Sequence, residues 1–288
     1  MKQKNNDAAG IAIDWYSFTV FCPDARTATP NDPLTSVAKC MAKAFGQDIA
    51  DTILAEGDWT EGIGRRPYPY SYKRSEDNMT IYYGAQDYVL CEMSGKTCSH
   101  YEKQFSLSAL LLATKHNATR LDVAIDTKPE IGNAETIASW CHYKRSKSRG
   151  TQISGTGSTF YIGSKTSDRF VRVYEYNKPN PRAGKPRIEF VLRKQNAEYC
   201  INSIAANGIA FAAQGLLNTF EFKGIRVMEH DETIAAARKD RKDSKTLTWI
   251  LTQCAPAIKR LIANGTIEDP QQFFDEHMMP DEKQERMF

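Results

Sequence analysis

The sequence lacks most of the patterns that identify common classes of protein. None of its 288 residues belongs to an uninterrupted apolar run approaching 18 residues, so we expect no membrane-spanning helix. The first ten residues are polar and without an apolar core, unlike a secretory signal. The seven cysteines are odd in number and include no C-x-x-C pair, which argues against a disulfide framework and a zinc knuckle. These absences predict a cytoplasmic protein.

Familiar catalytic signatures are also missing. The five histidines form neither an H-x-H nor an H-E-x-x-H pattern, and there is no Walker A or G-x-S-x-G sequence. This argues against a histidine-ligated nuclease, a zinc hydrolase and an ATPase. With 38 Lys and Arg against 35 Asp and Glu, the net charge of +3 is too small to indicate nucleic-acid binding. Any such function must therefore depend on local clusters.

The composition is typical of a globular protein, and the sequence contains both helical and strand periodicities. Hydrophobic residues make up 41% and charged residues 25%, which predicts a folded protein. Alternating β-branched and aromatic residues predict strands, apolar residues at helical spacing predict helices, and a stretch rich in Gly, Pro and Tyr predicts a long exposed loop. The predicted strands are 10–21, 79–84, 88–94, 119–126, 158–163, 169–176, 187–194 and 220–227; the helices are 34–54, 98–115, 133–147 and 197–214; the loop is 56–78.

The order of these elements predicts an α+β fold in which antiparallel sheets pack with helices. Strand, helix, two or three strands and helix occur twice, so we consider two similar units, about 10–117 and 118–215, that form one curved sheet. We predict one α+β domain over 1–228. A helical C-terminal extension and tail would follow over 229–288.

Strand parity places acids, arginines and tyrosines on common faces, because alternate residues of a strand point to the same side. The residues predicted to face away from the apolar side are Arg120, Asp122 and Asp126; Arg172, Tyr174 and Tyr176; and Arg187, Glu189 and Arg193. One interpretation is a solvated sheet face. The other is that these strands are neighbours, so that Asp122, Asp126 and Glu189 hold a divalent cation beside arginine and tyrosine, a set suited to phosphoryl transfer.

Two basic runs are candidates for nucleic-acid contact. The first contains Lys144, Arg145, Lys147 and Arg149, and precedes a glycine-containing loop, 150–157, whose backbone could approach phosphates. The second contains Arg65 and Arg66 and alternates cations with the tyrosines of 68–72, which suits phosphate binding and base stacking. Each run could equally be a solvated surface.

Five blocks in order resemble the Rep_trans family of replication initiation factors. They are LCEMSG (90–95), TRLDVAID (119–126), TFYIGSKTS (159–167), RVYE (172–175) and RIE (187–189). The family includes rolling-circle plasmid Rep proteins, replication initiators of filamentous phages and relaxases of conjugative elements. The resemblance implies site-specific DNA nicking that forms a 5′-phosphotyrosine and leaves a 3′-OH to prime replication. It therefore implies that the domain over 1–228 is catalytic and binds DNA.

The resemblance also implies roles for individual residues. Tyr174 would be the nucleophile, and Tyr176, two residues further along, could compete with it or act as a second tyrosine. Asp122, Glu189 and Asp126 would bind Mg²⁺ or Mn²⁺. Arg120, Arg172 and Arg187 would neutralise phosphate, and Lys165 would contact DNA.

The partners implied are double-stranded origin DNA, the displaced single strand and a host helicase, with the protein acting as a homodimer in the bacterial cytoplasm and not at a membrane. Two alternatives remain at this stage. One is a conjugative relaxase with the same chemistry. The other is a DNA-binding regulator of the same fold that does not cleave.

Overall fold

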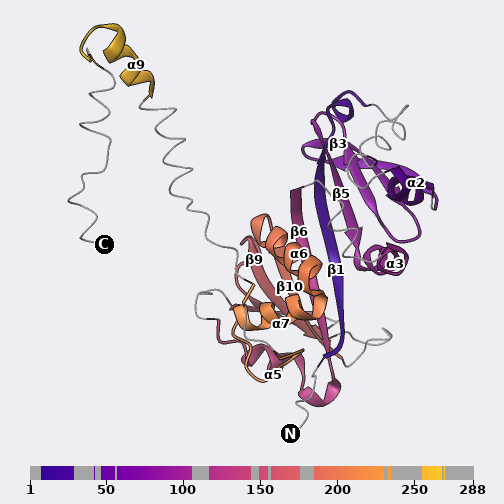
Figure 1. The fold of residues 1–288 in the computed structure, drawn as a ribbon. Helices are drawn as coiled ribbons and strands as arrows, with labels where there is room; N and C mark the ends of the chain where they lie inside the picture. Colours follow the sequence, from indigo (N-terminus) through magenta and orange to yellow (C-terminus); the bar gives the residue numbers. More distant parts are fainter. Residues whose placement is uncertain are drawn as a thin grey trace. The chain divides into compact units, whose positions relative to one another are not determined.

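The computed structural model describes residues 8–28, 42, 47–55, 57–105, 117–143, 149–154, 157–175, 185–229, 233–234, 255–267 and 269. The chain divides into two compact units, Met1–Ala236 and Ala237–Phe288. In the second unit, the described residues include one helix, α9 (Ala255–Ala263). All that follows concerns the first unit, whose sheet and helices confirm the predicted α+β class (Figure 1).

A ten-stranded antiparallel sheet organises the first unit, in the order β2-β3-β4-β5-β1-β6-β10-β9-β8-β7. Its strands are β1 (Ala8–Phe21), β2 (Trp59–Arg65), β3 (Tyr68–Arg74), β4 (Thr80–Tyr83), β5 (Tyr88–Ser94), β6 (Asn117–Thr127), β7 (Arg149–Ser154), β8 (Gly157–Ile162), β9 (Arg169–Glu175) and β10 (Pro186–Arg193). The two longest strands, β1 and β6, pair at its centre.

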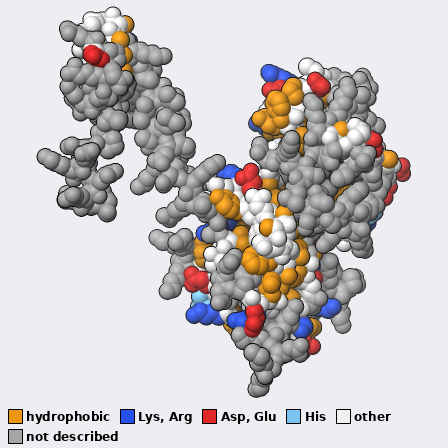
Figure 2. All heavy atoms as spheres, viewed as in Figure 1, with side chains coloured by type: hydrophobic (Ala, Val, Ile, Leu, Met, Phe, Trp, Pro, Cys, Tyr) orange, Lys and Arg blue, Asp and Glu red, His pale blue; other side chains and the backbone are white. Residues whose placement is uncertain are grey.

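Alternation of side chains gives the sheet one apolar face. In β6, Leu121, Val123 and Ile125 are fully buried in the core, while the intervening Asp122 points to the other face. Four helices supply the other wall of that core: α3 (Gly95–Phe105), α5 (Ala134–Ser139), α6 (Gln195–Asn207) and α7 (Ile209–Thr219). Figure 2 shows hydrophobic side chains gathered over α6 and α7. Two further helical elements, η1 (Pro23–Arg26) and α2 (Gln47–Ala55), belong to the first half of the chain.

The strand order is symmetric about the β1–β6 pair. In the first half the chain runs through β1, α2, β2, β3, β4, β5 and α3; in the second it runs through β6, α5, β7, β8, β9, β10 and α6. Moving outward from the centre gives β5, β4, β3 and β2 on one side and β10, β9, β8 and β7 on the other. The halves therefore share one topology, and equivalent positions can be matched by register.

The predicted loop over 56–78 is wrong, because this segment forms the β2–β3 hairpin. Tyr70 and Tyr72 lie at alternate positions and pack on Tyr83, with ring centroids 5.6 Å away in each case. The glycines that suggested a loop are required by close packing: a Cβ on Gly64 would lie 2.1 Å from the Tyr68 carbonyl oxygen. An edge hairpin tolerates glycine and proline that a central strand would not.

Several predicted boundaries also change. The helix expected over 133–147 ends as α5 at Ser139, and the one expected over 197–214 is broken at Gly208, whose φ of 86° favours glycine. Within 220–227 the structure has an isolated bridge between Cys141 and Phe222 in place of a strand. The glycine-containing stretch expected to form a phosphate loop belongs largely to β7 and β8.

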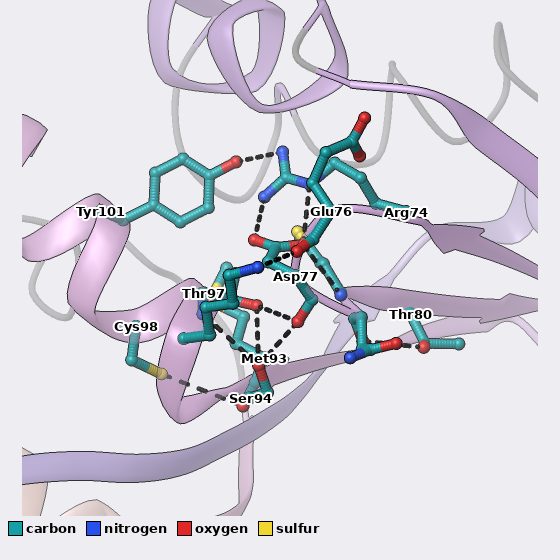
Figure 3. Close-up of polar contacts among 12 residues, drawn as sticks. Arg74, Glu76, Asp77, Thr80, Met93, Ser94, Thr97, Cys98 and Tyr101 are labelled. Atoms are coloured by element: carbon teal, nitrogen blue, oxygen red, sulfur yellow. Dashed lines mark hydrogen bonds and ion pairs between the residues drawn. The ribbon is translucent and has the colours of Figure 1, made fainter. Parts of the chain in front are cut away.

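A buried ion pair anchors the turn between β3 and β4 (Figure 3). Arg74 donates from Nε and Nη2 to the two carboxylate oxygens of Asp77 at 2.9 and 2.6 Å, and from Nη1 to the Tyr101 hydroxyl at 2.6 Å. The backbone carbonyl of Asp77 accepts hydrogen bonds from the hydroxyls of Ser94 and Thr97. This network ties the turn to β5 and α3.

Candidate functional site

The candidate site lies on the polar face of β6, β10 and β9, three adjacent strands. Register places Glu189 of β10 between Ala124 of β6 and Arg172 of β9. In the next row, Arg187 lies between Asp126 and Tyr174. Paired residues of an antiparallel sheet point to the same side, so their side chains can meet.

Tyr174 and Glu189 make the central contact of the site. The Tyr174 hydroxyl donates a 2.8 Å hydrogen bond to Glu189 Oε2, while Arg172 Nη2 contacts Glu189 Oε1. Glu189 is fully buried, whereas Tyr174 is half-buried and the Arg172 side chain is 30% exposed. The Tyr174 hydroxyl thus meets a buried carboxylate and lies beside a guanidinium that a ligand can still reach.

Asp122 supplies a second buried carboxylate beside Glu189. Arg120 holds it through two hydrogen bonds, Nε to Oδ1 at 2.8 Å and Nη2 to Oδ2 at 2.5 Å, and Arg172 Nη2 lies 3.6 Å from Oδ2. Burial raises the pKa of Asp122 to about 7; Arg120 opposes this rise and the neighbouring Glu189 carboxylate adds to it. Trp15 supports Arg120, whose guanidinium carbon lies 5.2 Å from the indole ring centre.

Asp126 belongs to a different cluster from the other two acids. Arg187 donates to its carboxylate oxygens from Nε at 2.6 Å and Nη2 at 2.9 Å, and to Asp14 from Nη1 at 2.7 Å. Although Asp122 and Asp126 share a face, four residues of strand place their Cα atoms about 13 Å apart. Arg187 is itself fully buried between two carboxylates, so its contacts support the sheet and do not favour the expected contact with phosphate.

The predicted cluster of three carboxylates is therefore not formed. Within the described part of the chain, no group of three or more His, Cys, Asp or Glu side chains is placed to hold a metal ion. The pair Asp122 and Glu189 remains, and Mg²⁺ commonly takes one or two carboxylates together with substrate phosphate. Arg172 Nε is buried with no hydrogen-bond partner among the described residues, which leaves a donor for an acceptor such as a phosphate oxygen. The residues thus fit a cation bound together with phosphate.

Lys165 lies at the rim of this site. Its ammonium nitrogen is 3.8 Å from the centre of the Tyr161 ring, and Tyr161 pairs with Arg172 across β8 and β9. Lys165 is exposed, and its backbone carbonyl accepts a hydrogen bond from Arg193. This position would let Lys165 contact a DNA strand bound at the site.

The remaining predicted residues lie elsewhere. Arg66 is exposed, and Arg65 at the end of β2 is 49% exposed and bonded to Glu92. Arg149 begins β7. Lys144, Arg145, Lys147 and Tyr176 fall outside the described residues.

Two residues of β1 that were not predicted from the sequence, Asp14 and Trp15, support Arg187 and Arg120. Asp14 has no partner in the β1–β6 register, which shifts between Ile13 and Trp15. A bulge of this kind re-aims a side chain. The available signal was Asp14 itself, the one charged residue in the stretch Ile11–Val20 of β1.

No described helix is long and apolar enough to cross a membrane. No model of a known protein family matches the chain. The chain is 24% identical over 291 aligned residues to a Bacillus subtilis (strain 168) protein named "Putative DNA relaxase NicK", with 80% of this chain and 81% of that protein covered. Its fold is similar to that of a rolling circle replication initiator protein from Geobacillus stearothermophilus, with a TM-score of 0.53, 22% identity, and coverage of 82% of this chain and 91% of that one.

Proposed function

We propose that this protein nicks DNA at a specific site and transfers the strand, initiating rolling-circle replication of a plasmid or phage. The hydrogen bond from the half-buried Tyr174 hydroxyl to the buried Glu189, beside Arg172, is the observation that carries this proposal. The similarity to a relaxase and the shared fold with a replication initiator support it.

In the proposed reaction, Tyr174 Oη attacks the phosphorus of the scissile phosphodiester. The bond between Oη and phosphorus forms as the bond to the 3′ oxygen breaks, which leaves a 5′-phosphotyrosine and a 3′-OH. Glu189 Oε2, 2.8 Å from Oη, accepts the phenolic proton, and the leaving 3′ oxygen takes a proton from solvent. A later attack by a 3′-OH on the phosphotyrosine would reseal the strand and release Tyr174.

The arginines of the site would act on the charge of the phosphate. Arg172 bridges Asp122 and Glu189 and keeps its Nε free of partners among the described residues, so it can donate to a phosphate oxygen as negative charge develops. Arg120 is committed to Asp122 by two hydrogen bonds and orients that carboxylate.

Asp122 and Glu189 are the residues we propose to hold Mg²⁺ or Mn²⁺. Such an ion would polarise the phosphate and neutralise charge in the transition state. It would also relieve the repulsion between the two buried carboxylates, which contributes to the raised pKa of Asp122 after burial itself.

The proposed substrate is origin DNA, together with the single strand displaced during replication. Lys165 lies at the rim of the site, and Arg65 and Arg66 lie at the tip of the β2–β3 hairpin, where each is exposed enough to contact phosphate. A host helicase and a homodimer belong to the same proposal on the strength of the family resemblance alone.

A conjugative relaxase would use the same chemistry on transferred DNA, and the contacts of Tyr174 fit both processes. A binder that does not cleave is less well supported, because it would have no need to bury two carboxylates beside a reachable tyrosine.

Covalent attachment to an oligonucleotide that carries the nick site tests the nucleophile. We expect Tyr174→Phe to abolish both the adduct and relaxation of supercoiled origin plasmid, because phenylalanine has no oxygen to attack phosphorus. Tyr88→Phe, at an exposed tyrosine outside the site, is the matched control and should retain both activities. An adduct that persists in Tyr174→Phe and disappears in Tyr176→Phe would assign the reaction to the neighbouring tyrosine.

Removal of the general base and of the metal gives a second test. We expect Glu189→Gln to lower the nicking rate by at least about 10²-fold, because it removes both the proton acceptor and a ligand, while most duplex binding remains. EDTA should stop nicking by the unmodified protein, and Mn²⁺ or Mg²⁺ should restore it. Undiminished nicking in EDTA would exclude the metal from the mechanism.

A further inference from the structure

The first half of the sheet contains a tyrosine and a glutamate at the positions equivalent to Tyr174 and Glu189. Strand β5 lies between β1 and β4, as β10 lies between β6 and β9. Glu92 of β5 pairs with Ser17 of the central strand and with Thr80 of β4, as Glu189 pairs with Ala124 and Arg172. Tyr82 follows Thr80 by two residues, as Tyr174 follows Arg172.

The two tyrosine–glutamate pairs lie on the same face of the sheet. Ser17 of β1 pairs with Glu92 on one side and with Arg120 on the other, and Arg120 shares its face with Asp122. Burial raises the pKa of the Tyr82 hydroxyl, and the charge of the neighbouring Glu92 carboxylate adds to this rise. Five strand spacings separate β4 from β9, so the pairs are about 24 Å apart across the sheet.

The first-half cluster differs from the candidate active site in its charges. Trp15 occupies the position equivalent to Asp122, so Glu92 is the one carboxylate that the described residues place in this cluster, and Thr80 occupies the position of Arg172. The arginine comes from the hairpin instead: Arg65 Nη2 lies 2.6 Å from Glu92 Oε1, and its guanidinium carbon lies 4.6 Å from the centre of the Tyr82 ring.

This set of groups suits the binding of a strand better than its cleavage. With Glu92 as its one carboxylate among the described residues, the cluster is a poorer site for a cation than the pair Asp122 and Glu189. Its arginine is 49% exposed, whereas Glu92 is buried, so a phosphate could approach Arg65 from solvent and compete with Glu92 for it. Aromatic faces beside an arginine also stack on unpaired bases.

We infer that Arg65, Tyr82 and Glu92 form a second site on this chain, which holds single-stranded DNA without cleaving it. This inference rests on the proposed function, since the strand would be the one cleaved at Tyr174. Glu92 keeps Arg65 in position through their ion pair. A phosphate that binds Arg65 replaces Glu92 as its partner.

Opposite effects of two substitutions test this site. The probe is a fluorescein-labelled oligothymidylate, measured by fluorescence anisotropy with the Tyr174→Phe protein at several salt concentrations. We expect Arg65→Gln to weaken binding about fivefold and to reduce the salt slope by about 0.7, the value for one lost phosphate contact. Glu92→Gln should tighten binding about threefold, because it removes the competitor and leaves Arg65 available. A purely structural ion pair would make both variants weaker.

Matched variants separate this effect from net charge. Arg26→Gln removes an arginine that is 66% exposed and lies 3.7 Å from Asp87, and Glu61→Gln removes an acid that accepts from the Tyr72 hydroxyl. Each should change oligonucleotide affinity by less than twofold. Equal effects in the test and control variants, or loss of affinity in Glu92→Gln, would overturn the site.

Two further outcomes are distinguishable. A covalent DNA adduct on Tyr82 in the Tyr174→Phe protein would show that the site cleaves, and would overturn the inference as stated. Failure of the unmodified protein to nick any origin plasmid would overturn the proposed function, and it is scored in a separate assay from oligonucleotide binding.

Discussion

The pKa of the Asp122 carboxyl group is set by burial, by the Arg120 guanidinium and by the Glu189 carboxylate. Burial and the adjacent Glu189 favour the protonated form, while two hydrogen bonds from Arg120 favour the ionised form, and the net result is a pKa of about 7. The group therefore changes charge within the physiological range. Because its pKa in the unfolded chain is near 3.9, this ionisation is coupled to folding.

We predict that Asp122→Asn changes the pH dependence of stability. The pKa is raised on folding, so protonation contributes stability that is fully present below about pH 4 and is lost as pH rises through about 7. Asparagine does not ionise and avoids this loss. In metal-free buffer, the melting temperature of the variant should therefore rise relative to that of the unmodified protein between pH 5 and pH 8. The expected difference is roughly 5 °C, because each pKa unit corresponds to about 1.4 kcal/mol of stability.

Thermal unfolding followed by circular dichroism measures this difference. A constant offset between the two proteins from pH 5 to pH 8 would show that Asp122 does not titrate in this range. Addition of Mn²⁺ at pH 8 should stabilise the unmodified protein more than the variant, because a bound cation favours the ionised carboxylate.

At the scale of single elements, the β3–β4 turn depends on the ion pair between Arg74 and Asp77. Burial raises the pKa of Asp77, but the hydrogen bonds from Arg74 and from the Met79 N–H outweigh it, so the pKa lies below its usual value. The side chains of Arg74 and Asp77 are only 3% and 6% exposed. Removing one partner leaves the other buried without its counter-charge.

We predict that Asp77→Asn lowers the free energy of unfolding by about 3 kcal/mol at pH 7. A pKa lowered on folding contributes stability above about pH 4 that is lost as pH falls, so the cost of the substitution should shrink toward pH 3. Urea unfolding at both pH values measures it. Asp87→Asn, which removes the exposed partner of Arg26, should cost less than about 1 kcal/mol; equal costs at the two sites would contradict the prediction.

Strand periodicity predicted the face shared by Tyr174 and Glu189, because parity within a strand is fixed by the backbone. It could not predict which acid would meet which arginine. Asp122 and Asp126 have the same parity, and only the register with β10 assigns Asp126 to Arg187. The β2–β3 hairpin was missed for a different reason. Strand β2 contains two glycines and the tyrosines of β3 are interleaved with a proline, while the packing on Tyr83 that stabilises the hairpin is not local in sequence.

The two halves of the first unit share one topology but carry different side chains on the polar face of the sheet. Both halves place a tyrosine diagonally across from a buried glutamate, and the second half adds Asp122 and an arginine that bridges two carboxylates. The symmetric sheet thus offers two similar positions on one face. We propose that differences at single residues assign DNA cleavage to the position in the second half and single-stranded DNA binding to the position in the first.

The first unit ends at Ala236, two residues beyond Ile234. Ile234 completes its packing: its N–H donates to the Gly215 carbonyl oxygen, and its own carbonyl oxygen accepts from the Thr219 hydroxyl at 3.0 Å. A chain that ends after Ala236 keeps these contacts and omits the second unit, Ala237–Phe288. We expect it to unfold cooperatively with a melting temperature within about 3 °C of the full chain, measured by calorimetry. A chain ending before Ile234 should melt several degrees lower, because it loses both hydrogen bonds and an apolar side chain packed against the core; identical melting of the two truncated chains would show that Ile234 does not contribute to the unit.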